Sequence, residues 1–144
     1  MSDKPKLSRH EAREIVFQLL FAKEFDKEAD PVEFYDNHAD NSETEYNAYI
    51  RTTFLGVCEK QPELDPAIEA ASIKWKMSRM STATRSVLRL AVYELTCTEV
   101  PAKVVLNEAV EIIKKFDAEN APAFVNGILN KIARDNTKID GENA

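Results

Sequence analysis

Glycine, histidine, cysteine and tryptophan are all scarce in this chain of 144 residues, which contains three, two, two and one of them respectively. So few glycines argue against sandwiches, barrels and glycine-rich phosphate loops. No apolar run reaches 18 residues, so we expect no membrane span. The polar start MSDKPKLSRHEAR lacks the apolar stretch of a signal peptide. These absences predict a cytoplasmic protein.

Motifs for catalysis and metal binding are also missing. His10 and His38 do not stand at metal-ligand spacing from a cysteine or an acid, and HEAR at 10–13 is not HExxH. The sequence contains no GxSxG, Walker or GxGxxG motif. Cys58 and Cys97 are far apart in helical patterns, which is typical of free thiols. We therefore predict no catalytic residue, no metal and no cofactor, and a protein that acts by binding macromolecules.

Helical periodicity extends through most of the chain, and no stretch alternates with the period of a strand. The pattern predicts an all-α fold of seven helices, in a single domain over 8–135 between a flexible basic arm at 1–7 and a disordered polar tail at 136–144. The predicted helices run from Ser8 to about Phe25, from Asp30 to a polar loop at 36–42, from 43 to 61, from Asp65 to Lys76, from Ser78 or Ser81 to Cys97, from Pro101, and from Pro122.

Gly127 lies inside the last predicted helix, where a glycine costs about 1 kcal/mol relative to alanine. The usual reason is the close approach of another backbone, so we interpret Gly127 as a helix contact. A ligand site is the alternative interpretation.

The charge distribution is uneven. The net charge of −6 argues against nucleic acid, but 24–47 holds nine acids against one lysine. Residues 4–13 carry four basic side chains against one acid, and 74–89 carry five with no acid. Local basic patches attract phosphates even on an acidic protein. The alternative is that both patches are ordinary solvated surface.

Three segments carry a family resemblance. The first is RHEAR at 9–13 with QLLF at 18–21, the second is SVLRLAVYEL at 86–95, and the third runs from PAKVVLNEAVE at 101–111 through Lys115 and Phe116 to FVNGILNKI at 124–132. In order and spacing, over about 8–134, they resemble the bacterial NusB family of transcription antitermination factors.

The resemblance implies two three-helix bundles packed across each other. It also implies binding to the boxA segment of nascent ribosomal RNA, together with NusE, a small-subunit ribosomal protein. That complex joins RNA polymerase and suppresses premature termination in ribosomal RNA operons, with no cofactor and no membrane. Some NusB-like proteins self-associate through their RNA surface, so a monomer or a weak, autoinhibited homodimer is expected.

The family's functional residues map onto this chain one at a time. Arg9 and Arg13 match an arginine-rich motif in which His10 replaces an arginine, and a histidine carries little charge at neutral pH. Phe21 stands where a tyrosine often meets RNA, and its ring can still stack on a base. The predicted RNA-binding set adds Lys4 and Lys6 of the arm, which could compensate for the missing arginine, to the positions that match the family: Arg9, His10, Arg13, Phe21, Asn120 and Phe124.

The partner surface implied by the resemblance covers about 75–89. Its candidate contacts are Arg79, Thr84 and Arg85. The positive charge there could meet RNA or an acidic partner, or could form a solvated face.

Two other functions stay open. One is a protein-interaction adaptor without RNA binding, which the missing arginine at His10 favours. The other is an RNA methyltransferase, because a similar helical domain occurs fused to such enzymes. The absence of a glycine-rich cofactor loop argues against it.

Overall fold

A computed structural model describes residues 7–39, 46–73, 75–117 and 120–143, with only the backbone described from 137 onward. Lys4, Lys6 and almost all of the predicted basic arm lie outside the described residues. The chain divides into two compact units, 1–58 and 59–144, and the predicted domain over 8–135 covers most of both. Each unit is described separately.

The first unit is built from α1 (Arg9–Lys23), α2 (Pro31–His38) and the first part of α3 (Asn47–Ser72). The Ser8 hydroxyl accepts the Glu11 N–H, and the Glu11 carboxylate accepts the Ser8 N–H, so the predicted capping box is present. The Asp30 carboxylate caps α2 by accepting the Glu33 N–H. Both helix starts are confirmed.

Aromatic packing joins α2 to α3 in this unit. The Phe34 ring stacks on Phe54 at 5.9 Å between centroids and on the His38 imidazole at 3.9 Å. The other buried apolar side chains of the unit are Ala12, Val16, Phe17, Leu19, Leu20, Ile50 and Val57.

Helix α3 runs unbroken through Pro62 and Pro66, so the two helices predicted at 43–61 and from Asp65 are one, and the prediction of seven helices was wrong. The described residues form six α-helices and one short 3-10 helix. Both prolines are exposed, so the carbonyls left without an N–H donor lie on the solvent side. Leu64 and Ile68 are buried on the other side, and their packing outweighs the two lost hydrogen bonds.

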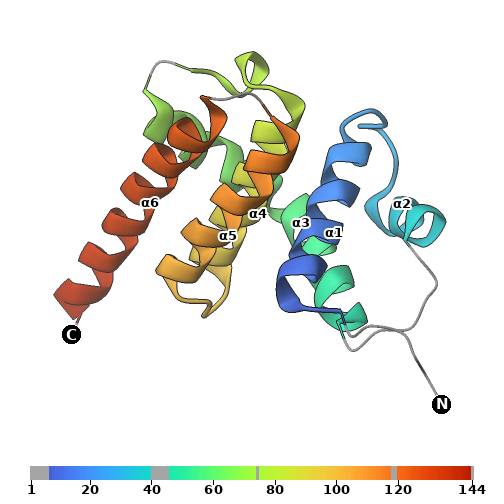
Figure 1. The fold of residues 1–144 in the computed structure, drawn as a ribbon, viewed down its shortest axis with the longest axis horizontal. Coiled ribbons are helices and arrows are strands. Elements are labelled where there is room, and N and C mark those ends of the chain that lie inside the picture. The colour runs from blue at the N-terminus through green and yellow to red at the C-terminus, as the bar shows by residue number, and fades with distance from the viewer. Residues whose placement is uncertain (1–6, 40–45, 74, 118–119, 144) are drawn as a thin grey trace. The chain divides into compact units, whose positions relative to one another are not determined.

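The second unit holds the end of α3, the 3-10 helix η1 (Met77–Arg79), α4 (Thr82–Cys97), α5 (Ala102–Phe116) and α6 (Ala121–Asn143). The last three helices pack against one another (Figure 1). Ser81 caps α4 by accepting the Thr84 N–H, as one of the two predicted caps. The backbone of α6 is helical to Asn143, although a tail was predicted from 136.

An ion pair ties α3 to α4. The Arg89 guanidinium donates to both carboxylate oxygens of Asp65, at 2.8 and 3.0 Å. The Arg89 side chain is only 8% exposed and that of Asp65 is 25% exposed. Asp65 lies between the two prolines, so this bidentate contact holds the weakened stretch of α3 against its neighbour.

Helix α3 ends in a conformation that an isoleucine seldom adopts. Ile73 has a φ of 63°, in the left-handed region that favours glycine. Its N–H donates to the Glu69 carbonyl at 3.3 Å, which closes the last turn. The chain therefore leaves the helix sharply at this point and leads to Trp75.

Gly127 does not serve a helix contact. A Cβ built at this glycine would meet nothing within 4 Å, apart from its own helix backbone and chain neighbours. The predicted close approach was therefore wrong, and the glycine faces open space on α6.

Among the described residues, no helix is both long enough and apolar enough to cross a membrane.

Replacing Asp65 with asparagine removes the carboxylate from a nearly buried guanidinium. Because Arg89 stays buried without its counter-charge, we expect Asp65→Asn to lower the free energy of unfolding by about 3 kcal/mol in urea denaturation. The control is Glu63→Gln, which removes an exposed carboxylate 3.6 Å from Lys60 on the same helix and should cost below about 1 kcal/mol. Equal, small losses for both variants would contradict the role given to Asp65.

Replacing Gly127 with alanine should stabilise the protein. The site has room for a methyl group, and alanine is favoured over glycine in a helix by about 1 kcal/mol, so Gly127→Ala should raise the free energy of unfolding by about that much. Gly127→Ser should give roughly half the gain in the same denaturation experiment. A loss of stability in both variants would show that the site is tightly packed after all.

Candidate nucleic-acid interface

The guanidinium of Arg9 lies at the start of α1 against two tyrosine rings. It is 4.2 Å from the ring centroid of Tyr49 and 4.9 Å from that of Tyr46, and the residue is exposed. Cation–π contacts of this kind orient a guanidinium without neutralising it. Arg9 can therefore present a planar, charged fork to a phosphate or a base.

The other two members of the arginine motif are placed differently. Arg13 is only 4% exposed, with its guanidinium 5.9 Å from the Tyr49 ring centroid. The Nε2 atom of His10 is 3.3 Å from a carboxylate oxygen of Glu14. Of the three residues, Arg9 is exposed, His10 is half-buried and Arg13 is buried, a difference that the sequence motif alone does not show.

Phe21 belongs to a row of phenylalanines in which Phe17 and Phe21 lie on α1 and Phe25 follows just after its end. Its ring lies 6.2 Å from that of Phe17 and 5.5 Å from that of Phe25, both tilted. Phe17 is buried, whereas Phe25 is 73% exposed. The row therefore runs from the core of the first unit to its surface, with Phe21 at the boundary.

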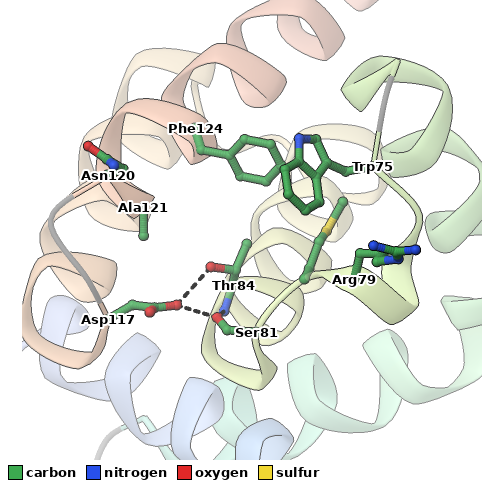
Figure 2. A pocket seen from close by; sticks show the side chains of 9 residues that line it. Trp75, Arg79, Ser81, Thr84, Asp117, Asn120, Ala121 and Phe124 are labelled. Atoms are coloured by element: carbon green, nitrogen blue, oxygen red, sulfur yellow. Dashed lines mark hydrogen bonds between the residues drawn. The ribbon is translucent and has the colours of Figure 1, made fainter.

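The second unit contains a pocket of about 280 Å³ between the α3–α4 connection and the start of α6 (Figure 2). It brings together Asn120 and Phe124, predicted to bind RNA, with Arg79 and Thr84, predicted to contact a partner protein. The other lining residues are Trp75, Met80, Ser81, Asp117 and Ala121.

An aromatic pair forms one wall of this pocket. The rings of Trp75 and Phe124 meet edge to face, with centroids 6.3 Å apart and an interplanar angle of 80°. Figure 2 shows the two rings pointing toward each other along this wall. Trp75 remains 48% exposed, which is unusual for so large an apolar side chain.

Asp117 connects the end of α5 to the start of α4. Its carboxylate accepts hydrogen bonds from the hydroxyls of Ser81 and Thr84, the latter at 2.9 Å (Figure 2). Thr84 is buried. Its hydroxyl therefore serves this contact within the unit, and its predicted role toward a partner protein stays a prediction.

The basic run at 74–89 is not one surface. Arg85 donates to the carbonyls of Met77 and Met80, at 3.2 and 2.5 Å, and Arg89 lies in its pair with Asp65. Lys76 and Arg79 are exposed. The interpretation of 74–89 as a single solvated face is therefore wrong for the two arginines that face inward.

Neither Trp75 nor Asp117 was among the site residues predicted from the sequence, although Trp75 lies in the predicted partner surface at 75–89. The available signal was that the chain's one tryptophan stands next to the end of the helix predicted from Asp65 to Lys76 and begins the segment 75–89.

Two tyrosines have altered acidity, and neither lines the pocket. Burial raises the pKa of Tyr35, and the guanidinium of Arg51 opposes this shift. Burial likewise raises the pKa of Tyr93. Both phenols stay protonated at neutral pH, so neither adds a charge to an RNA surface.

In the part of the chain that the structure describes, no group of three or more histidine, cysteine, aspartate or glutamate side chains could hold a metal ion.

Comparison with known proteins gives consistent results. The model of the NusB family matches residues 10–134. A transcription antitermination protein NusB from Agathobacter rectalis is 40% identical over 131 residues, which is 88% of this chain and 100% of that protein. The transcription antitermination protein NusB from Anaeromyxobacter dehalogenans is 53% identical over 78 residues, which is 54% of this chain and only 55% of that protein.

Solved structures agree with the sequence relatives. A structure of NusB from T. maritima has a TM-score of 0.83 and 35% identity, covering 90% of this chain and 93% of the other. The structure of the antitermination factors NusB and NusE in complex with dsRNA has a TM-score of 0.76 and 25% identity, covering 88% and 96%. With the family model matched from the second residue of α1 almost to the end of the described side chains, this chain belongs to the NusB family.

Proposed function

We propose that this protein is an RNA-binding transcription antitermination factor. Together with NusE it binds a boxA-type single-stranded segment of nascent ribosomal RNA and joins RNA polymerase to suppress premature termination. Relatives named as antitermination proteins support this function, as does the similar chain in the complex of NusB, NusE and dsRNA. The expectation that the chain is not an enzyme is confirmed by its family.

The observation that carries the proposal is the exposed guanidinium of Arg9 on its two tyrosine rings. A guanidinium held in place loses less freedom on binding, and its fork matches a phosphate bidentately. Phe21 and Phe124 add apolar rings on which an unpaired base can stack. In this proposal, Arg9 and the arm lysines Lys4 and Lys6 bind phosphates, and Phe21 and Phe124 stack on bases. Asn120 contacts a base edge, and the half-buried His10 and the buried Arg13 contribute less.

The shortage of basic contacts explains the need for a partner. With about three phosphates neutralised, binding by the chain alone should be modest at physiological salt. A protein that brings further RNA contacts raises the affinity of the pair by acting at high effective concentration. We place the protein in the cytoplasm, where transcripts emerge, and a weak homodimer remains a prediction.

Fluorescence anisotropy of a labelled boxA-type RNA and of a scrambled RNA, with and without NusE, tests this function. We expect this protein to prefer boxA and NusE to strengthen that preference, because specificity is divided between the two proteins. Equal, weak binding to both RNAs that NusE leaves unchanged would contradict the proposal and favour the protein-interaction adaptor.

Arg9 should contribute a phosphate contact that salt screens. The logarithm of the binding constant should fall with the logarithm of salt concentration with a slope of about −2, and Arg9→Gln should reduce that slope by about 0.7. Lys103→Gln removes an exposed charge on α5 and serves as the matched control, with an unchanged slope. The same slope for both variants and the wild type would exclude Arg9 as an RNA contact.

A further inference from the structure

We propose that the pocket of the second unit holds one unpaired nucleobase of the bound RNA, stacked on Trp75, with the adjoining phosphate beside Arg79. This inference rests on the proposed RNA-binding function and adds to it a base-binding residue, Trp75, at a defined site. The family motifs in the sequence do not single out this tryptophan.

The size of the pocket limits its occupant. Its volume of about 280 Å³ falls just below the range of roughly 300–1,000 Å³ typical of small-molecule and cofactor sites. A single base or a single apolar side chain fits that volume better than a whole cofactor. The rings of Trp75 and Phe124 stand nearly at right angles, which suits a flat ligand. A flat ring that stacks on the face of one of these side chains contacts the edge of the other.

Exposure of the tryptophan supports an occupant from outside the chain. Trp75 is 48% exposed although it is part of an aromatic pair, so the unit itself does not complete its packing. Base–aromatic stacking tolerates any base, because every base has a π-face. An exposed indole beside a pocket therefore forms a stacking platform for a single strand.

The charges of the lining residues favour a phosphate at the rim of the pocket over one inside it. The Asp117 carboxylate lines the pocket and repels an anion, so a neutral base is favoured inside. Arg79 is exposed and lines the side of the pocket opposite Asn120 (Figure 2). A guanidinium at the rim can bind the phosphate next to the base, and the Asn120 amide can both donate to and accept from a base edge.

Gly127 gives a separate indication from α6. It lies three residues after Phe124, on the same side of the helix, where a Cβ would meet open space. Since no packing within the unit requires this glycine, the ligand-site alternative remains, and a bare helix backbone next to Phe124 leaves room for a strand.

Trp75 is the only tryptophan of the chain, so its fluorescence reports on the pocket directly. We expect boxA-type RNA to quench the tryptophan emission of the wild-type protein. We also expect a series of RNAs, each with one base replaced by an abasic site, to identify one position. Loss of the base at that position should abolish the quenching and weaken binding. NusE carrying no tryptophan, or a tryptophan-free variant of it, keeps the signal unambiguous.

Two pairs of variants test the residues. Trp75→Leu should weaken boxA binding roughly 5- to 150-fold, the range for loss of one base stack, whereas Trp75→Phe should keep most of the affinity. The control Phe116→Leu removes a ring that is 39% exposed and does not line the pocket, and it should bind as the wild type does. Arg79→Gln should flatten the salt dependence, and Lys103→Gln should not.

The outcomes separate this inference from the proposed function. Wild-type protein that fails to prefer boxA RNA, with NusE present, overturns both. The base-binding role of the pocket alone is overturned if the protein binds boxA RNA specifically, the Trp75 emission does not change, and Trp75→Leu keeps full affinity. If Trp75→Leu loses NusE binding but keeps RNA binding, the pocket holds a side chain of the partner protein. That result would overturn the proposal that a nucleobase occupies it. If Trp75→Leu does not fold, the wild-type quenching series and Trp75→Phe decide.

Discussion

Hydrogen bonds from charged side chains hold the connection between α3 and α4, and the pocket of the second unit depends on them. The Glu69 carboxylate accepts the Met77 N–H at 2.7 Å, and Arg85 donates to the carbonyls of Met77 and Met80. A short connection without such partners would leave backbone groups unsatisfied next to the core. These hydrogen bonds tie the connection to α3 and to α4, and so hold the backbone that carries Trp75 and Arg79.

The same charged residue types serve two purposes in this protein. Arg85, Arg89 and Asp117 satisfy groups within the second unit, where their removal would leave buried polar atoms without partners. Arg9 and Arg79 are exposed, and in our proposals they meet RNA. A strongly acidic chain can in this way bind an anion, because a few oriented guanidinium groups determine the local potential.

Helix starts were the most predictable feature of the fold, because capping is local. The serine and glutamate of the α1 capping box stand three residues apart in the sequence and bond as expected. The continuity of α3 could not be read in the same way, since Pro62 and Pro66 favour a break locally and burial of Leu64 and Ile68 overrides them. Tertiary packing therefore determines that α3 is continuous, and a local sequence pattern does not reveal such packing.

The candidate site was predictable in part. Family motifs in the sequence pointed to Arg9 and Phe124, but a run of charge does not reveal which side chains turn inward. Arg85 and Arg89 are one turn apart on α4, and their partners in η1 and α3 come from distant positions in the sequence. Trp75 is in none of those motifs, and the role that we propose for it follows from the pocket that three separate segments enclose.

The most direct test of the account is to map where RNA touches the protein. Photo-crosslinking of boxA RNA containing 4-thiouridine to the wild-type protein with NusE, followed by mass spectrometry, identifies the contacting residues. The account predicts crosslinked peptides that contain the start of α1 around Arg9 and the pocket residues Trp75 and Phe124. Crosslinks confined to other surfaces, such as the exposed face of α5, would contradict it.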